Sequence, residues 1–153
     1  MDKFEPKDAN FEARARDSFA RQGIMETLGA RMTDVEEGLV RIEVDYHDGL
    51  SQQHGFFHAG VTATIADSAG GYAAQTLYPA DVTVLTTEFK LNLLAPAHGE
   101  RLVATGRVIK PGRTLTVTDM EVAAISNGKE KLCAKGLQTI IGVAGRPEKE
   151  AAG

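Results

Sequence analysis

The sequence has no tryptophan, a single cysteine at position 133 and no long hydrophobic run. One cysteine excludes a disulfide within the chain and favours a reducing, cytoplasmic location. No apolar stretch approaches the ~20 residues of a membrane-spanning helix, and the first residues lack the apolar region of a signal peptide. Because 17 Lys and Arg stand against 21 Asp and Glu, for a net charge of −4, nucleic-acid binding is disfavoured. We therefore expect a cytoplasmic protein that binds neither membranes nor nucleic acids.

Charge is also scarce within one internal segment. Asp67 is the only formally charged side chain in the 32 residues from Gly49 to Ala80. At the average charged fraction of proteins, a stretch of that length would carry about eight charges. A carboxylate is rarely buried unless something compensates its charge. Asp67 is therefore either a structural hydrogen-bond acceptor in a buried segment or a functional group.

The length and composition predict one domain of the α+β class. The chain is long enough to bury a core without disulfides or metals. Its charged, amphipathic beginning predicts an N-terminal helical segment at about 8–29, made of helices at 8–21 and 23–28. A core is expected at about 30–143 and a flexible tail at 146–153.

The core is predicted to combine one buried helix with an antiparallel sheet. The segment Phe57–Leu77 is rich in Ala, Thr and Gly and is apolar nearly all round, which favours a buried helix that ends before Pro79. Alternation of apolar and polar residues predicts strands at 39–46 and 82–94. Turn residues between strand-like segments predict further strands at 32–36, 102–110, 114–126 and 131–143. The expected arrangement is a long helix lying on a meander-like sheet.

The start of this helix and Asp67 are the groups best suited to chemistry. If the helix begins near residue 57 or 58, its first unpaired backbone N–H groups belong to His58, Ala59 and Gly60, and they suit an oxyanion or a polarised carbonyl. Asp67 lies nine residues beyond His58, or ~13 Å along a helix that rises ~1.5 Å per residue. These groups cannot act on one atom within a single chain, whereas a symmetric dimer could pair the helix start of one chain with Asp67 of the other.

Other chemistries have weaker support in the sequence. A metal site built from His54, His58 and Asp67 is disfavoured because the helix has not yet formed between the two histidines and no H-E-x-x-H pattern is present. Ser68 lacks the G-x-S-x-G elbow of a serine hydrolase. Cys133 lies in a predicted strand and is expected in the core rather than as a nucleophile. We expect no metal and no separate cofactor.

The segment Gln52–Asp67, which reads QQHGFFHAGVTATIAD, resembles the signature of hotdog-fold acyl-CoA thioesterases. The nearest are the PaaI-type (phenylacetyl-CoA pathway) branch and the 4-hydroxybenzoyl-CoA thioesterases. In that family a His-Gly-Gly step opens the central helix, an acid follows the His by nine residues, and a Gln or Asn precedes it by six. His58, Asp67 and Gln52 match these positions, whereas Ala59 replaces the first glycine.

Two later segments extend the resemblance over about residues 25–143. The run 86–97 is similar to the family's strand after the helix, and 108–114 is similar to its basic hairpin. The resemblance implies a hotdog fold, in which an antiparallel sheet wraps around a long central helix. It also implies hydrolysis of an acyl- or aryl-CoA thioester by a homodimer or a dimer of dimers.

The resemblance assigns a role to each matched residue. The thioester carbonyl would accept a hydrogen bond from the Ala59 N–H, with help from Gly60, while Asp67 of the facing subunit acts as general base or nucleophile. Gln52 would hold the water or the carbonyl, and His58 would fix the helix start. Thr86 matches the Ser/Thr position near the nucleophilic water. The candidates for the coenzyme A phosphates are Lys90, Lys110, Gly112 and Arg113, whose charges could equally belong to solvated strands and turns.

Two other function classes stay open at this point. A hotdog hydratase would carry a different spacing of its Asp/His pair, which is absent here. A non-catalytic acyl-CoA binding protein would bind the same ligand without turning it over. The acyl group is not defined, because Phe56, Phe57, Tyr72 and Leu77 suit either an acyl pocket or the core.

Overall fold

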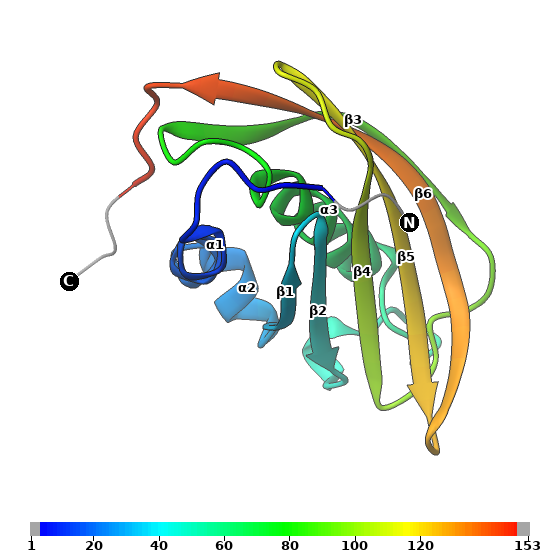
Figure 1. Ribbon diagram of the computed structural model, residues 1–153. Coiled ribbons are helices and arrows are strands. Elements are labelled where there is room, and N and C mark those ends of the chain that lie inside the picture. Colours follow the sequence, from blue (N-terminus) through cyan, green and yellow to red (C-terminus); the bar gives the residue numbers. More distant parts are fainter. Residues whose placement is uncertain (1–3, 150–153) are drawn as a thin grey trace.

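The computed structural model describes residues 4–149 of the chain. Six strands form one antiparallel sheet that curves around a long helix, α3, while two short helices cover the side of α3 that the sheet leaves open (Figure 1). No helix among the described residues is long and apolar enough to cross a membrane. In chain order the elements are α1 (Phe11–Ala20), α2 (Gly23–Leu28), β1 (Arg31–Glu36), β2 (Leu39–Asp45), a 3-10 turn (Asp48–Leu50), α3 (Ala59–Gln75), β3 (Val82–Leu93), β4 (Arg101–Lys110), β5 (Leu115–Ser126) and β6 (Lys129–Ala144).

The strand order in the sheet is β1-β2-β4-β5-β6-β3. The strand that follows α3 in the sequence, β3, therefore pairs with the last strand, β6, and lies at one edge. The turn between β5 and β6 is the predicted Asn127-Gly128 hairpin, and both residues have positive φ angles of 51° and 73°. Such angles are typical of a tight two-residue turn and are best tolerated by Asn and Gly.

The predicted helix and strands agree with the structure within a few residues. The helix begins at Ala59, two residues later than expected, because His58 occupies its N-cap position. Of the expected flexible tail, residues 150–153 lie outside the described part. Residues 146–149 form no regular element, yet Glu148 accepts hydrogen bonds from Ser18 and Arg21 of the N-terminal helical segment.

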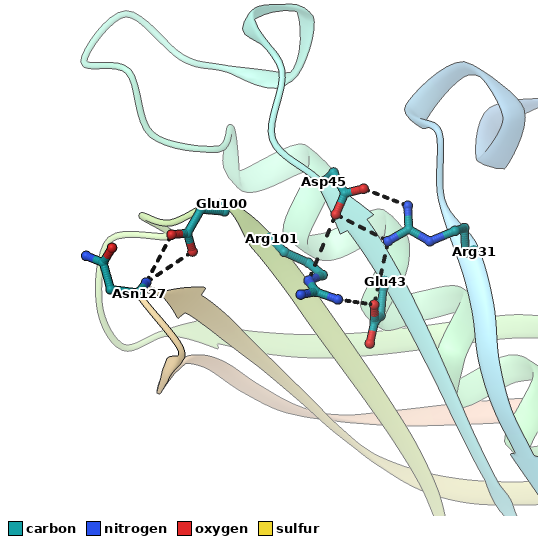
Figure 2. Close-up of polar contacts among 6 residues, drawn as sticks. All are labelled: Arg31, Glu43, Asp45, Glu100, Arg101 and Asn127. Atoms are coloured by element: carbon teal, nitrogen blue, oxygen red, sulfur yellow. Dashed lines mark hydrogen bonds and ion pairs between the residues drawn. The ribbon is translucent and has the colours of Figure 1, made fainter.

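A row of ion pairs crosses the exposed ends of β1, β2 and β4 (Figure 2). Arg31 contacts Asp45 at 2.8 Å, and Arg101 contacts Glu43 at 2.9 Å. The hydrogen bond from Arg31 lowers the pKa of the Asp45 carboxyl below its usual value. Because these side chains are largely exposed, the pairs contribute little to stability and mainly fix the strand ends.

Helix α3 lies directly on the sheet because glycine stands where the two backbones meet. A Cβ atom at Gly106 of β4 would lie 2.3 Å from the main-chain carbon of Ala69 in α3. A Cβ at Gly70 would lie 2.1 Å from the side-chain oxygen of Gln138 on β6. Real Cβ atoms do not approach other atoms so closely, so Gly106 is required by the helix backbone, while a side chain at position 70 would displace the Gln138 amide.

We expect Gly106→Ala to destabilise the fold, since the new methyl group meets backbone rather than a side chain that can move. Overpacking of this kind typically costs about 1–3 kcal/mol, which corresponds to a loss of ~2–4 °C in Tm per kcal/mol for a chain of this length. Thermal unfolding measures the effect. Gly23→Ala is the matched control, because a Cβ there meets nothing within 4 Å and alanine favours the helix. An unchanged Tm in Gly106→Ala would contradict the close approach.

Candidate active site

The carboxylate of Asp67 is held from two strands. It lies in the middle of α3, half-buried, and its Oδ1 accepts a hydrogen bond from the Thr86 hydroxyl on β3 at 2.7 Å. The Gln138 side-chain amide donates to the same oxygen at 2.5 Å and to the Asp67 carbonyl at 3.1 Å. Oδ2 has no hydrogen-bond partner among residues 4–149. One oxygen therefore fixes the orientation of the carboxylate while the other remains available.

Gln138 is the functional candidate that the sequence analysis missed. It is fully buried on β6, and its Oε1 accepts a hydrogen bond from Thr118 of β5 at 2.9 Å. This contact turns the amide nitrogen toward Asp67. The signal was present in the predicted strand 131–143, because Gln138 occupies the inward phase that Ala134, Gly136 and Ile140 otherwise fill.

At the start of α3, His58 acts as the N-cap residue. Its Nδ1 accepts a hydrogen bond from the Gly60 N–H at 2.8 Å, so the ring satisfies one of the helix's unpaired donors. The Gly60 N–H is thus engaged by the His58 ring in the described chain, and its role as a second oxyanion donor stays a prediction. The Ala59 N–H makes no hydrogen bond to any residue between 4 and 149, and it remains the available donor at the positive end of the helix.

Gln52 closes the loop that leads into α3. Its Oε1 accepts hydrogen bonds from the backbone N–H groups of His54, at 2.5 Å, and Phe56, at 3.3 Å. The side-chain nitrogen makes no hydrogen bond within residues 4–149. Gln52 and Ala59 line one cavity of about 590 Å³, which we call the helix-start cavity. The hydroxyl of Thr62, one turn beyond Ala59, borders the same cavity and is buried without a partner in the described chain.

Asp67 borders a different cavity. Its volume is about 320 Å³, and it lies between α3 and β3, with Ser18, Tyr72 and Glu148 among its walls. The Tyr72 hydroxyl lies 3.1 Å from the Ser18 hydroxyl, and burial raises the pKa of Tyr72 to about 12. Ala59 and Asp67 are eight residues apart on one continuous helix, or ~12 Å at ~1.5 Å per residue. Within one chain, the helix-start donor and the carboxylate therefore occupy separate cavities.

The edge strand β3 leaves apolar side chains uncovered. Phe89 is 43% exposed and Leu93 is 57% exposed. Their partners across the strand pair are Gln138 and Ala134, which point toward α3. Since paired residues share a face of the sheet, Phe89 and Leu93 lie on the α3 side, beyond the reach of the helix.

The expected coenzyme A residues lie elsewhere in the chain. Gly112 and Arg113 border a hollow at the end of α3, together with Leu77 and Tyr78, and Lys110 ends the strand that leads into this hairpin. That end is ~24 Å from Ala59 along a helix of this length. Lys90 of β3 donates a hydrogen bond to Asn92 at 2.9 Å and is paired with the exposed Leu137. One chain alone does not bring these residues to the helix start.

The remaining candidates have structural partners. Ser68 donates a hydrogen bond to Gln22 at 3.1 Å. Cys133 is buried, and burial raises the pKa of its thiol. Between residues 4 and 149, no group of three or more His, Cys, Asp or Glu is placed to hold a metal ion. Of the four candidates for an acyl pocket, Phe57, Tyr72 and Leu77 belong to the core. Phe57 also borders the helix-start cavity, together with the half-buried Phe56.

A curved antiparallel sheet around one long central helix is the architecture of the hotdog fold, and the Ala59 N–H and Asp67 are its candidate site groups. Residues 54–131 match the model of the Thioesterase superfamily. A crystal structure of a thioesterase family protein from Silicibacter pomeroyi is 46% identical, superposes with a TM-score of 0.87, and covers 88% of this chain and 99% of its own. The chain belongs to the thioesterase superfamily, and both the predicted family and the predicted fold class are confirmed.

Two more distant proteins agree with this assignment. The 1,4-dihydroxy-2-naphthoyl-CoA hydrolase of Listeria monocytogenes is 26% identical over 100 residues, which cover 65% of this chain and 81% of that protein. The PaaI protein from the phenylacetic acid degradation operon of E. coli superposes with a TM-score of 0.79 over 89% of this chain and 95% of its own. At 19% identity, the PaaI comparison is one of fold.

We expect Gln138→Leu to lower kcat for thioester hydrolysis by roughly 10- to 100-fold, with a smaller change in KM, because Asp67 loses the donor that orients it. Thiol release under saturating substrate measures the effect. Gln138→Glu keeps the size but removes the donor, and should also be impaired. Thr87→Ala, on the same edge strand, removes only a hydroxyl that donates to the Thr139 carbonyl and serves as control. Wild-type kcat in both Gln138 variants would show that Asp67 needs no such support.

Proposed function

We propose that the protein hydrolyses acyl- or aryl-CoA thioesters to the free acid and coenzyme A, in active sites that two subunits share. The observation that carries the proposal is the distance along one rigid helix between two polar groups that are both available to a substrate. The Ala59 N–H and Asp67 Oδ2 are both without partners in the described chain, yet they are ~12 Å apart. A second copy with its α3 running in the opposite direction could bring its Asp67 opposite Ala59.

The uncovered edge of β3 supports this dimer. Edge strands with exposed apolar side chains are normally paired or covered, and Phe89 and Leu93 offer such a surface on the α3 side. An edge-to-edge pairing of two β3 strands would place the two α3 helices side by side. The assembly we propose is therefore a homodimer or a dimer of dimers, in which the homodimer is the smallest unit with a shared site.

The first chemical step uses water as the nucleophile. Asp67 of the partner subunit takes a proton from a water molecule through Oδ2 while the water oxygen bonds to the thioester carbon. The carbonyl oxygen gains negative charge and accepts a hydrogen bond from the Ala59 N–H, which the helix dipole strengthens. The side-chain nitrogen of Gln52 is available to position the carbonyl or the water, and Thr86 lies beside the carboxylate.

The second step breaks the carbon–sulfur bond. As the carbonyl re-forms, the sulfur leaves with the bonding electron pair and receives the proton that Asp67 had taken. The products are a carboxylic acid and coenzyme A, and Asp67 is again ionised. Direct attack by Asp67 to give a mixed anhydride, which water then hydrolyses, balances equally well. Coenzyme A is part of the substrate, so the reaction needs no separate cofactor.

The family supports the reaction class, and the name of the Listeria relative supports a CoA thioester as substrate. The hairpin residues Lys110, Gly112 and Arg113, together with Lys90, stay candidates for the coenzyme A phosphates if the partner subunit supplies them. The cytoplasm is the location we propose, because Cys133 would stay a free thiol there.

We expect Asp67→Asn to lower kcat by about 10²- to 10⁴-fold, since it removes the base and keeps the shape. A thiol-release assay over short, medium, long and aryl acyl-CoAs tests the substrate class and the role of Asp67 together. Full activity of Asp67→Asn across this panel would refute the role of Asp67. Binding of acyl-CoA by the wild type without thiol release would instead identify a non-catalytic binding protein.

We expect Ala59→Pro to lose roughly 10²- to 10³-fold in kcat without loss of Tm. Proline replaces the N–H hydrogen with a ring carbon and is well tolerated at the first position of a helix. His58 already has the extended conformation, with ψ of 140°, that a residue before proline adopts.

Ala59→Pro and Asp67→Asn together test the shared site. Co-expressed subunits would form some mixed dimers in which one of the two sites is intact, restoring roughly a quarter of wild-type activity for random pairing of a symmetric dimer. Activity no higher than the mean of the two parents would place both groups in one chain.

A further inference from the structure

A third cavity lies next to the helix-start cavity and is lined by residues of the β5–β6 hairpin. Its volume is about 700 Å³, and its walls include Lys129 and Lys131. It shares Phe56 and Pro96 with the helix-start cavity. A continuous surface therefore runs from the Ala59 N–H to the two lysines, and we call the far part of it the hairpin cavity.

The two lysines point to the same side of the sheet as α3. Lys131 is paired with Ala124, which is 2% exposed and belongs to the core. Paired residues share a face, and Lys129 shares that face with Lys131 because side chains alternate along a strand. Glu130, between them, is paired with Ile125 on the opposite face, yet it also borders the hairpin cavity. Among the residues that line the cavity, two lysines stand against this one carboxylate.

Neither lysine is committed to another part of the described chain. Within residues 4–149, Lys129 and Lys131 form no ion pair, whereas Lys135 of the same strand contacts both Asp119 and Glu121. The second nearby acid, Glu100, is engaged: its carboxylate oxygens accept hydrogen bonds from the Asn127 N–H at 3.0 and 3.2 Å (Figure 2). This contact fixes the turn that carries the lysines.

The cavity also offers an aromatic surface. The rings of Phe56 and His98 meet edge to face, with centroids 5.6 Å apart, and both residues border the hairpin cavity. Aromatic side chains are good platforms for nucleobases, while lysines bind phosphate as point charges. Cations and aromatic rings at one end of a surface that begins at the oxyanion donor match the order of groups in an acyl-CoA.

We propose that the hairpin cavity binds the nucleotide part of coenzyme A, with Lys129 and Lys131 as its phosphate contacts and Phe56 beside the base. The inference rests on the proposed function, and it locates the leaving group on the subunit that supplies Ala59. The thioester then lies at the helix start, and the pantetheine arm follows the helix-start cavity past Phe56 and Pro96.

The test compares two substrates that share an acyl group. One is the acyl-CoA, and the other is the N-acetylcysteamine thioester, which keeps the thioester but lacks the nucleotide. The double variant Lys129→Ala/Lys131→Ala should raise KM for the acyl-CoA on the order of tenfold and leave KM for the short thioester unchanged. The salt dependence of the acyl-CoA KM should also become weaker.

The matched control is Arg107→Ala/Lys135→Ala, which removes two positive charges that contact Glu121 on β5. This variant should leave both KM values close to wild type. A rise in the acyl-CoA KM with the control variant alone, or an equal rise for both substrates in the Lys129/Lys131 variant, would overturn the proposal.

Binding without turnover separates this proposal from the function itself. Adenosine 3′,5′-bisphosphate, titrated calorimetrically, should bind the wild type and the Arg107/Lys135 variant equally and bind the Lys129/Lys131 variant on the order of tenfold more weakly. If no thioester is hydrolysed but this difference is found, the nucleotide site stands and the hydrolase function fails. If thioesters are hydrolysed and the difference is absent, the nucleotide site fails alone.

Discussion

The close contact between α3 and the sheet is the constraint on which the other features depend. Glycine at positions 70 and 106 lets the helix backbone approach β4 and the buried Gln138. Only at this distance can Gln138 on β6 reach Asp67 on the helix while Thr118 holds its other end. The polar chain from β5 through β6 to α3 is therefore a product of backbone packing. A helix seated further out would leave both a buried amide and a carboxylate without partners.

The same rigid helix sets the distance between the two halves of the chemistry. A regular α-helix cannot shorten the ~12 Å between Ala59 and Asp67, and each group borders its own cavity. Two copies of such a helix offer a simple solution, because opposite directions exchange near and far ends. If the nucleotide of coenzyme A binds at the β5–β6 hairpin, the two subunits have different roles at each site. One subunit would hold the leaving group and the carbonyl, and the other would supply the carboxylate.

Much of this arrangement can be predicted from residue pattern alone. Alternation and turn residues together identified all six strands, and the lone carboxylate in an uncharged segment singled out Asp67. The hydrogen bond from the Gly60 N–H to His58 could not be predicted, because capping by His58 depends on the ring's rotamer and not on spacing. Gln138 was missed because one polar residue in a strand can face either solvent or core until the register is known. Lys129 and Lys131 could not be singled out from the sequence, because the face they share depends on the pairing of Lys131 with Ala124.

The exposed edge of β3 links solubility to activity. A twelve-residue strand with free backbone groups and uncovered Phe and Leu side chains is a template on which other chains can pair without limit. Pairing of β3 with the β3 strand of one identical copy covers both edges. Because a twofold contact leaves no free β3 edge, no further chain can add to the sheet there. The contact that completes a catalytic site would then also protect the protein from open-ended aggregation. A mutation at Phe89 or Leu93 would therefore affect both the activity and the solubility of the protein.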